Sequence, residues 1–129
     1  NLRLIFPGLY LTRAQAVQRL YDDAGRPAVS TAAGFSDVAA GADYLNAVAW
    51  AKAQGIVNGV SDSSFAPDET ITQAQFAAML TRYAAVQGKA GASRDATLSQ
   101  GMTYAESHGL LTGSAVTASS ADYALTKLG

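Results

Sequence analysis

Thr72-Gln73-Ala74-Gln75-Phe76-Ala77-Ala78-Met79-Leu80-Thr81-Arg82-Tyr83 is the stretch, residues 72–83, that decides the fold. Its apolar residues recur at the spacing of one helix face, which predicts a buried stripe made of Phe76, Met79, Leu80 and Tyr83. Its first four residues predict the helix start, because a threonine followed three residues later by glutamine can form a capping box. The stretch therefore predicts a capped amphipathic helix over 72–86.

The chain repeats this pattern. Thr12-Arg13-Ala14-Gln15 is a second start of the same kind. Residues 47–59 match residues 101–113 in register, and residues 71–82 can be laid on residues 116–127. Internal similarity of this kind predicts repeated supersecondary units. The expected elements are five helices, at 12–23, 43–54, 72–86, 97–108 and 117–128.

The connections carry their own signals. Gly55 and Gly109 are expected to end their helices in the left-handed conformation, with Ile56 and Leu110 folding back onto the last turn. The segment 60–71 is a polar loop that contains one aromatic residue, Phe65. We expect Phe65 to anchor this loop in the core.

Composition excludes several classes of function. The 129 residues are 49% hydrophobic and 15% charged, which is typical of a globular chain. Nine basic residues are scattered among ten acidic ones, so no nucleic-acid partner is expected. Without cysteine there is no disulfide, thiolate metal site or cysteine nucleophile, and no apolar run is long enough to predict insertion into a membrane. His108, at a helix end, is expected to be structural, and we expect no metal and no cofactor.

Five pieces of sequence occur in an order that resembles the S-layer homology domain family: 35–38 (Phe-Ser-Asp-Val), 47–48, 55–59, 65–67 (Phe-Ala-Pro) and 71–80. Residues 35–86 resemble a nearly complete copy. Residues 1–27 resemble the second half of a preceding copy whose leading helix is absent, and residues 93–128 resemble a degenerate third copy. The resemblance implies an all-α fold, in which helix–loop–helix units pack as one pseudo-threefold bundle over residues 1–129.

The resemblance also implies a function. Members of the family attach bacterial surface proteins to secondary cell-wall polysaccharide, often pyruvylated, and catalyse no reaction. The expected location is therefore extracellular, at the bacterial cell surface. Thr12 and Arg13 match the family's threonine-arginine-alanine-glutamate motif, with Gln15 in place of glutamate. Arg13 at a helix start could hold the carboxylate of a pyruvyl group with two hydrogen bonds. The other candidate ligand-binding residues are Asp37, Gly59, Gln73 and Trp50, with Tyr10 or Tyr44 as further rings for stacking on a sugar.

Each candidate also has a structural interpretation. Arg13 could be a solvated residue of the first helical turn, Asp37 could cap a turn by accepting backbone amides, and Trp50 could belong to the core. Gly59 could be required by backbone conformation alone. These interpretations compete with ligand binding at each position.

Two other functions compete with wall binding. Gln73 and Ala118 stand where the arginine of the motif is expected in the second and third copies, which favours a structural or assembly module with a decayed glycan site. Its partner would be another copy of the chain or the rest of a larger surface protein. The second rival is a glycan-cleaving enzyme that uses Asp37 and Asp43 as paired carboxylates, but no second motif supports it.

Overall fold

The computed structural model describes residues 10–29, 35–39, 41–57, 63–113 and 115–128. These residues form an all-α fold with five helices and no β-strand, as predicted. The helices are α2 (Arg13–Asp23), α3 (Leu45–Ala53), α4 (Gln73–Val86), α5 (Leu98–Ser107) and α6 (Ala118–Leu128). Each bound lies within two residues of the predicted one, and most of the differences arise because the predicted ranges included the capping residue.

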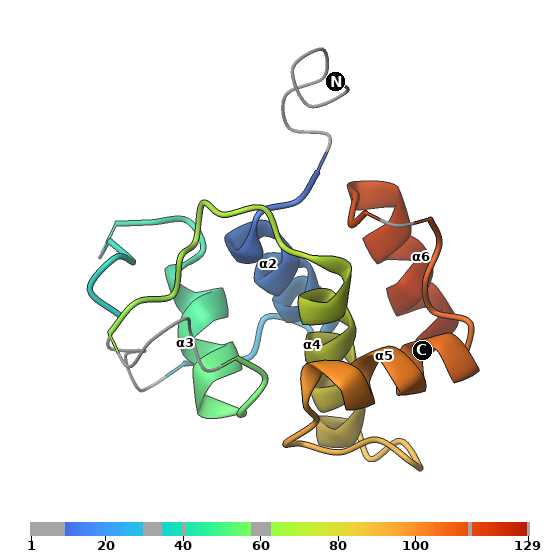
Figure 1. Ribbon diagram of the computed structural model, residues 1–129. Coiled ribbons are helices and arrows are strands. Elements are labelled where there is room, and N and C mark those ends of the chain that lie inside the picture. Colours follow the sequence, from blue (N-terminus) through green and yellow to red (C-terminus); the bar gives the residue numbers. More distant parts are fainter. Residues whose placement is uncertain (1–9, 30–34, 40, 58–62, 114, 129) are drawn as a thin grey trace.

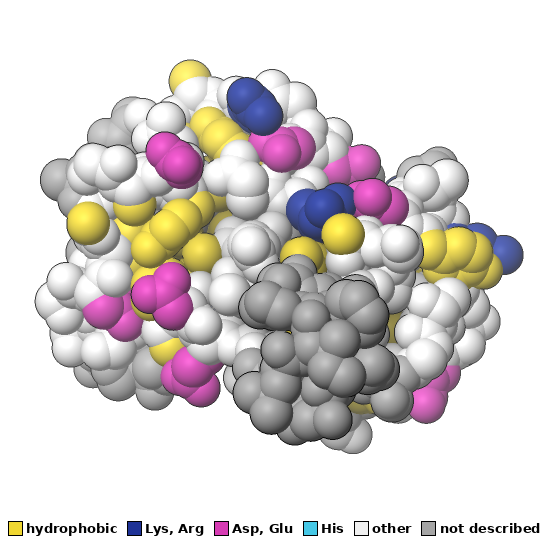
Figure 2. Space-filling model, turned by 90° about the horizontal axis from the view of Figure 1, so that it is seen from above, with side chains coloured by type: hydrophobic (Ala, Val, Ile, Leu, Met, Phe, Trp, Pro, Cys, Tyr) yellow, Lys and Arg dark blue, Asp and Glu magenta, His cyan; other side chains and the backbone are white. Residues whose placement is uncertain are grey.

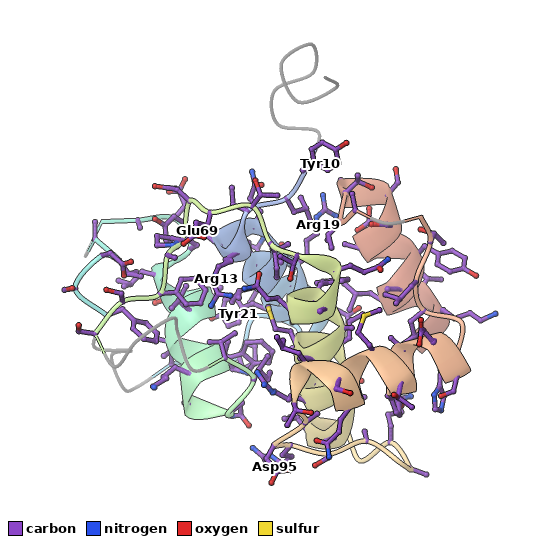
Figure 3. All side chains as sticks on the ribbon, viewed as in Figure 1. Tyr10, Arg13, Arg19, Tyr21, Glu69 and Asp95 are labelled. Atoms are coloured by element: carbon purple, nitrogen blue, oxygen red, sulfur yellow. The ribbon has the colours of Figure 1, made fainter. Side chains whose placement is uncertain are left out.

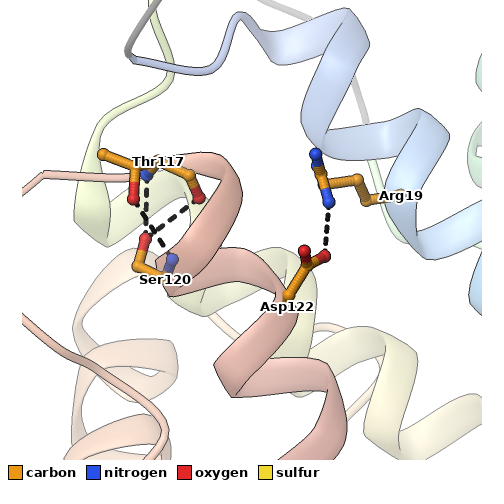
Figure 4. A network of polar contacts seen from close by, with 4 residues as sticks. All are labelled: Arg19, Thr117, Ser120 and Asp122. Carbon is orange, nitrogen blue, oxygen red and sulfur yellow. Dashed lines mark hydrogen bonds and ion pairs between the residues drawn. The ribbon is translucent and has the colours of Figure 1, made fainter.

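Side-chain caps fix the helix starts. In α2 and α4 the threonine hydroxyl accepts a hydrogen bond from the backbone N–H of the glutamine three residues later, at 3.1 Å. The side-chain Oε1 of that glutamine accepts from the backbone N–H of the threonine, at 2.9 Å. Both predicted capping boxes are therefore confirmed. A third box, Thr97 with Gln100, starts α5. At the start of α6 Ser120 takes the place of glutamine and makes three hydrogen bonds with Thr117 (Figure 4).

The predicted helix ends are also confirmed. Gly55 and Gly109 have φ angles of 78° and 67°. The amide of Ile56 donates to the carbonyl of Ala51 at 2.8 Å, and the amide of Leu110 donates to that of Ala105 at 2.9 Å. These bonds close the last helical turn and direct the apolar residue back onto it.

Helix α2 lies between α3 and α6, with α4 beside it and α5 running across α4 (Figure 1). Helices α4 and α5 form the most extensive pair, and they meet at Gly101. A Cβ atom built there would lie 2.5 Å from the Cα of Ala78, so glycine is what lets the two backbones approach this closely. An ion pair between Arg19 and Asp122 links α2 to α6 (Figure 4).

The starts of α2, α4 and α6 are joined through the backbone. Each of these helices is preceded by an apolar residue and a threonine: 11–12, 71–72 and 116–117. The amide of Leu11 donates to the carbonyl of Val116 at 2.9 Å, and the amide of Ile71 donates to that of Leu11 at 3.0 Å. All three helices begin at the upper end of the molecule in Figure 1 and run downward. Positions that the repeat pattern makes equivalent are therefore neighbours.

A cluster of aromatic rings occupies the core between α2, α3 and α4. The ring of Trp50 lies 5.5 Å from that of Tyr21 and 5.9 Å from that of Tyr83. Phe65 is fully buried, as predicted for a residue that anchors its loop. The predicted stripe of α4 is at most 3% exposed at each of its four positions, Phe76, Met79, Leu80 and Tyr83.

Candidate functional site

Arg13 is the first residue of α2, and its side chain is built into the protein. The residue is 7% exposed. Its Nε donates to the carbonyl oxygen of Phe65 at 2.8 Å, and its guanidinium carbon lies 4.8 Å from the centre of the Phe65 ring. Figure 3 shows Arg13 between α2 and the segment that leads to α4. Burial lowers the pKa of Arg13, and the carboxylates of Glu69 and Asp37 oppose that shift.

Asp37 holds the same loop from the other side. Its two carboxylate oxygens accept from the amides of Phe65 and Ala66, each at 2.8 Å. These two donors hold the pKa of Asp37 below its ordinary value of 3.8, and Arg13 acts in the same direction. Ala66 has a φ of 60°, a strained value for a residue with a Cβ. The capping interpretation of Asp37 is therefore confirmed, and we call Arg13, Asp37, Phe65 and Ala66 the loop clasp.

The loop clasp should respond to acid. Because folding lowers the pKa of Asp37, its contribution to stability is present above about 3.8 and is lost as the pH falls through the lower, folded-state value. We expect the stability difference between the wild-type protein and Asp37→Asn to narrow as the pH falls from about 6 to about 2. Urea denaturation at a series of pH values measures this difference. Glu106→Gln, an exposed change on α5, is the control, and a difference for Asp37→Asn that is constant with pH would contradict the role of the carboxylate.

The other predicted site residues lie elsewhere. Gln73, the first residue of α4, donates from Nε2 to the carbonyl of Gly113 at 2.7 Å, so it holds the loop before α6 as Arg13 holds the loop before α4. Trp50 is 5% exposed and lies in the aromatic core, in agreement with its structural interpretation. Gly59 lies outside the described residues. The structure thus brings Thr12, Arg13 and Asp37 to one loop but not Gln73 or Trp50; ligand binding by any of them stays a prediction.

A groove of about 670 Å³ lies between α2 and the start of α3. Polar and aromatic side chains dominate its lining. Its described residues are Ala14, Gln15, Gln18, Tyr21, Asp22, Arg26, Asp43, Tyr44 and Asn46. Gln15, Gln18 and Asp22 follow one another at intervals of three and four residues, which places them on one face of α2. The sequence could have indicated this side of the groove, because the three polar residues recur on one face of α2. Nothing in the sequence indicated that α3 lies opposite that face.

The hydrogen bonds inside the groove centre on Asp22. Its Oδ1 accepts from Nε2 of Gln18 at 2.9 Å and from Nε of Arg26 at 2.8 Å. Burial tends to raise the pKa of Asp22, but the bonds from Gln18 and Arg26 outweigh it and lower the pKa. Arg26 has a φ of 54°, so the backbone at the end of α2 is strained where it places this side chain.

Tyr44 lines the groove close to two acidic residues. Burial raises the pKa of the Tyr44 hydroxyl, and the carboxylates of Asp68 and Asp37 add to that effect. Figure 2 shows a face on which hydrophobic side chains line a hollow and acidic side chains surround it. The groove can therefore offer amide groups, carboxylate oxygens and an aromatic ring, and it lies close to a region of negative charge.

Within the described part of the chain, no three His, Asp or Glu side chains are placed so that they could hold a metal ion. None of the described helices has the length and apolar character needed to cross a bilayer.

Residues 34–77 match the model of the S-layer homology domain family. No curated protein matches the chain. The matched segment contains Asp37, helix α3, the Phe65 loop and the capped start of α4, so the family pattern and the loop clasp fall on the same residues. Domains of this family are generally non-catalytic modules that anchor proteins to the bacterial cell wall. On these grounds, residues 34–77 are assigned to an S-layer homology domain.

Proposed function

We propose that this protein is a non-catalytic anchoring module that binds secondary cell-wall polysaccharide at the outer surface of a bacterium. The family match supports the anchoring role. The observation that carries the binding proposal is the groove between α2 and α3, whose volume of about 670 Å³ falls in the range of small-molecule sites. Its amide, carboxylate and tyrosine side chains are suited to sugar hydroxyl groups and ring faces.

The proposal includes the division of residues 1–129 into three copies, 1–27, 35–86 and 93–128, in a pseudo-threefold bundle. Two links support it: the backbone bonds from Leu11 to Val116 and from Ile71 to Leu11 join equivalent positions. The bonds from Arg13 to Phe65 and from Gln73 to Gly113 support it independently, since each joins the first residue of a helix to the loop of the following copy. On this division the groove lies between the first copy and the second.

Residues of the loop clasp then have a positioning role. Arg13 and Asp37 hold the loop before α4, and the side chains that would contact the polymer are those on the groove walls, such as Gln18, Tyr44 and Asn46. Tyr44 is partly exposed, whereas Trp50 has little surface left for a sugar. A pyruvylated polymer stays a prediction of the family resemblance.

Sedimentation with purified cell walls tests the function. We expect the protein to sediment with walls that retain their secondary polysaccharide and to stay in solution with walls stripped of it. Asn46→Ala removes an exposed groove side chain and is expected to reduce binding several-fold, since one hydrogen bond contributes about 0.5–1.5 kcal/mol. Thr103→Ala, on the exposed face of α5, is the matched control. Equal sedimentation with intact and stripped walls would refute polysaccharide binding.

One observation favours a second function, a structural module that packs against another copy of the chain or the rest of a larger surface protein. The motif residue after the capping threonine is Arg13, Gln73 or Ala118, and in the first two the side chain is bound to the protein's own backbone. A module that has lost its glycan site would behave in this way. It would stay in solution with every wall preparation and would self-associate in analytical ultracentrifugation.

A further inference from the structure

We propose that the groove between α2 and α3 takes an uncharged sugar, rich in hydroxyl and acetamido groups, rather than a sugar that carries a carboxylate. This inference rests on the proposed polysaccharide-binding function and names the chemical class of its ligand. It follows from the charges that line the groove and from the partners that each nearby cation already has.

The lining of the groove is acidic. Among its described residues, two carboxylates, Asp22 and Asp43, face one cation, Arg26, so the formal charge is 1 − 2 = −1. Nε of Arg26 lies 2.8 Å from Oδ1 of Asp22, so this cation already has a carboxylate beside it. A ligand carboxylate would have to compete with Asp22 for Arg26 while it meets the charge of Asp43.

The other cations of the two helices are also committed. Arg13 is 7% exposed and donates to the Phe65 carbonyl. Arg19 pairs with Asp122 of α6 (Figure 4). The ammonium of Lys52 on α3 lies 5.2 Å from the centre of the Phe35 ring. None of these three side chains lines the groove among the residues that the structure describes.

The same lining is well matched to neutral sugars. Asp43 is exposed and can accept a hydrogen bond from a sugar hydroxyl, and such bonds to a charged acceptor are stronger than neutral ones. The side-chain amides of Gln18 and Asn46 can both donate and accept, as an acetamido group requires. Tyr44 offers part of its ring to a sugar face.

Calorimetric titration with one polysaccharide in two forms tests this inference. The probes are a pyruvylated wall polysaccharide and the same polymer after mild acid has removed its pyruvyl groups. We expect the polymer without pyruvyl groups to bind at least as tightly as the pyruvylated form, and its affinity to persist at about 1 M NaCl, where charge attraction is screened. Asp43→Asn should weaken binding of the form without pyruvyl groups several-fold, because it replaces a charged acceptor with a neutral one, while Glu106→Gln on α5 should not.

The outcomes separate this inference from the function on which it rests. A loss of affinity of tenfold or more after removal of the pyruvyl groups would overturn the uncharged ligand and leave wall binding intact. Binding of neither form would overturn the polysaccharide-binding function, and the inference with it.

Discussion

Gly101→Ala is expected to lower the free energy of unfolding by about 2–4 kcal/mol, because the added methyl group has no space between α4 and α5. The new Cβ would lie 2.5 Å and 2.6 Å from the Cα and N of Ala78, and 2.9 Å from the carbonyl carbon of Ala77. These are backbone atoms of α4, so no side-chain rotation can relieve the overlap. The two helices would have to separate, which opens the contacts of Tyr104 and Ala105 with the core.

Intrinsic helix preference acts in the opposite direction. Alanine is favoured over glycine inside a helix by about 1 kcal/mol. The expected loss of stability given above is therefore the cost of the steric overlap minus this gain in helix preference. Gly41→Ala is the control, since a Cβ there would meet no atom within 4 Å. Urea denaturation followed by circular dichroism measures both variants. If Gly101→Ala proved as stable as the wild-type protein, the close approach of α4 and α5 would be wrong.

The sequence predicted the helices because their boundary signals are local. Thr12 with Gln15, and Thr72 with Gln75, satisfy the first amides of their own helices, and Gly55 and Gly109 end α3 and α5 within one turn. Such signals act over four or five residues and do not depend on the rest of the fold. The close approach at Gly101 was not predicted, because it depends on α4, some 20 residues away.

The candidate site was less predictable for the same physical reason. Arg13 has the appearance of an anion-binding residue when only its helix is considered, since a cation stands beside free amide groups. Its partner, the carbonyl of Phe65, lies 52 residues further on. The groove likewise exists only because Tyr44 and Asn46, at the start of α3, lie across from Gln18 of α2. Periodicity shows which face of α2 is polar, but only tertiary packing shows what lies opposite.

Arg13→Ala is expected to destabilise the protein by about 2–3 kcal/mol, because it removes a charge-assisted hydrogen bond and a contact with an aromatic ring. The carbonyl of Phe65 would lose its donor, and the Asp37 carboxylate would lose the nearby positive charge. Arg13→Lys should recover only part of the loss, since an ammonium lacks the planar fork that bonds the carbonyl while it stacks on the ring. Urea denaturation measures the stability of both variants.

The matched control is Arg19→Ala, which removes an arginine of the same helix whose ion pair with Asp122 is exposed, and it should cost no more than about 1 kcal/mol. Amide hydrogen exchange at Phe65 and Ala66 provides a local measurement: it should accelerate in Arg13→Ala and stay unchanged in Arg19→Ala, because Arg13, unlike Arg19, bonds to that loop. If Arg13 instead contacts the polysaccharide directly, Arg13→Ala will lose wall binding while its stability and the exchange of these two amides match the wild-type protein. That result would show that Arg13 belongs to the binding surface and has no positioning role. It would also favour a ligand that carries a carboxylate.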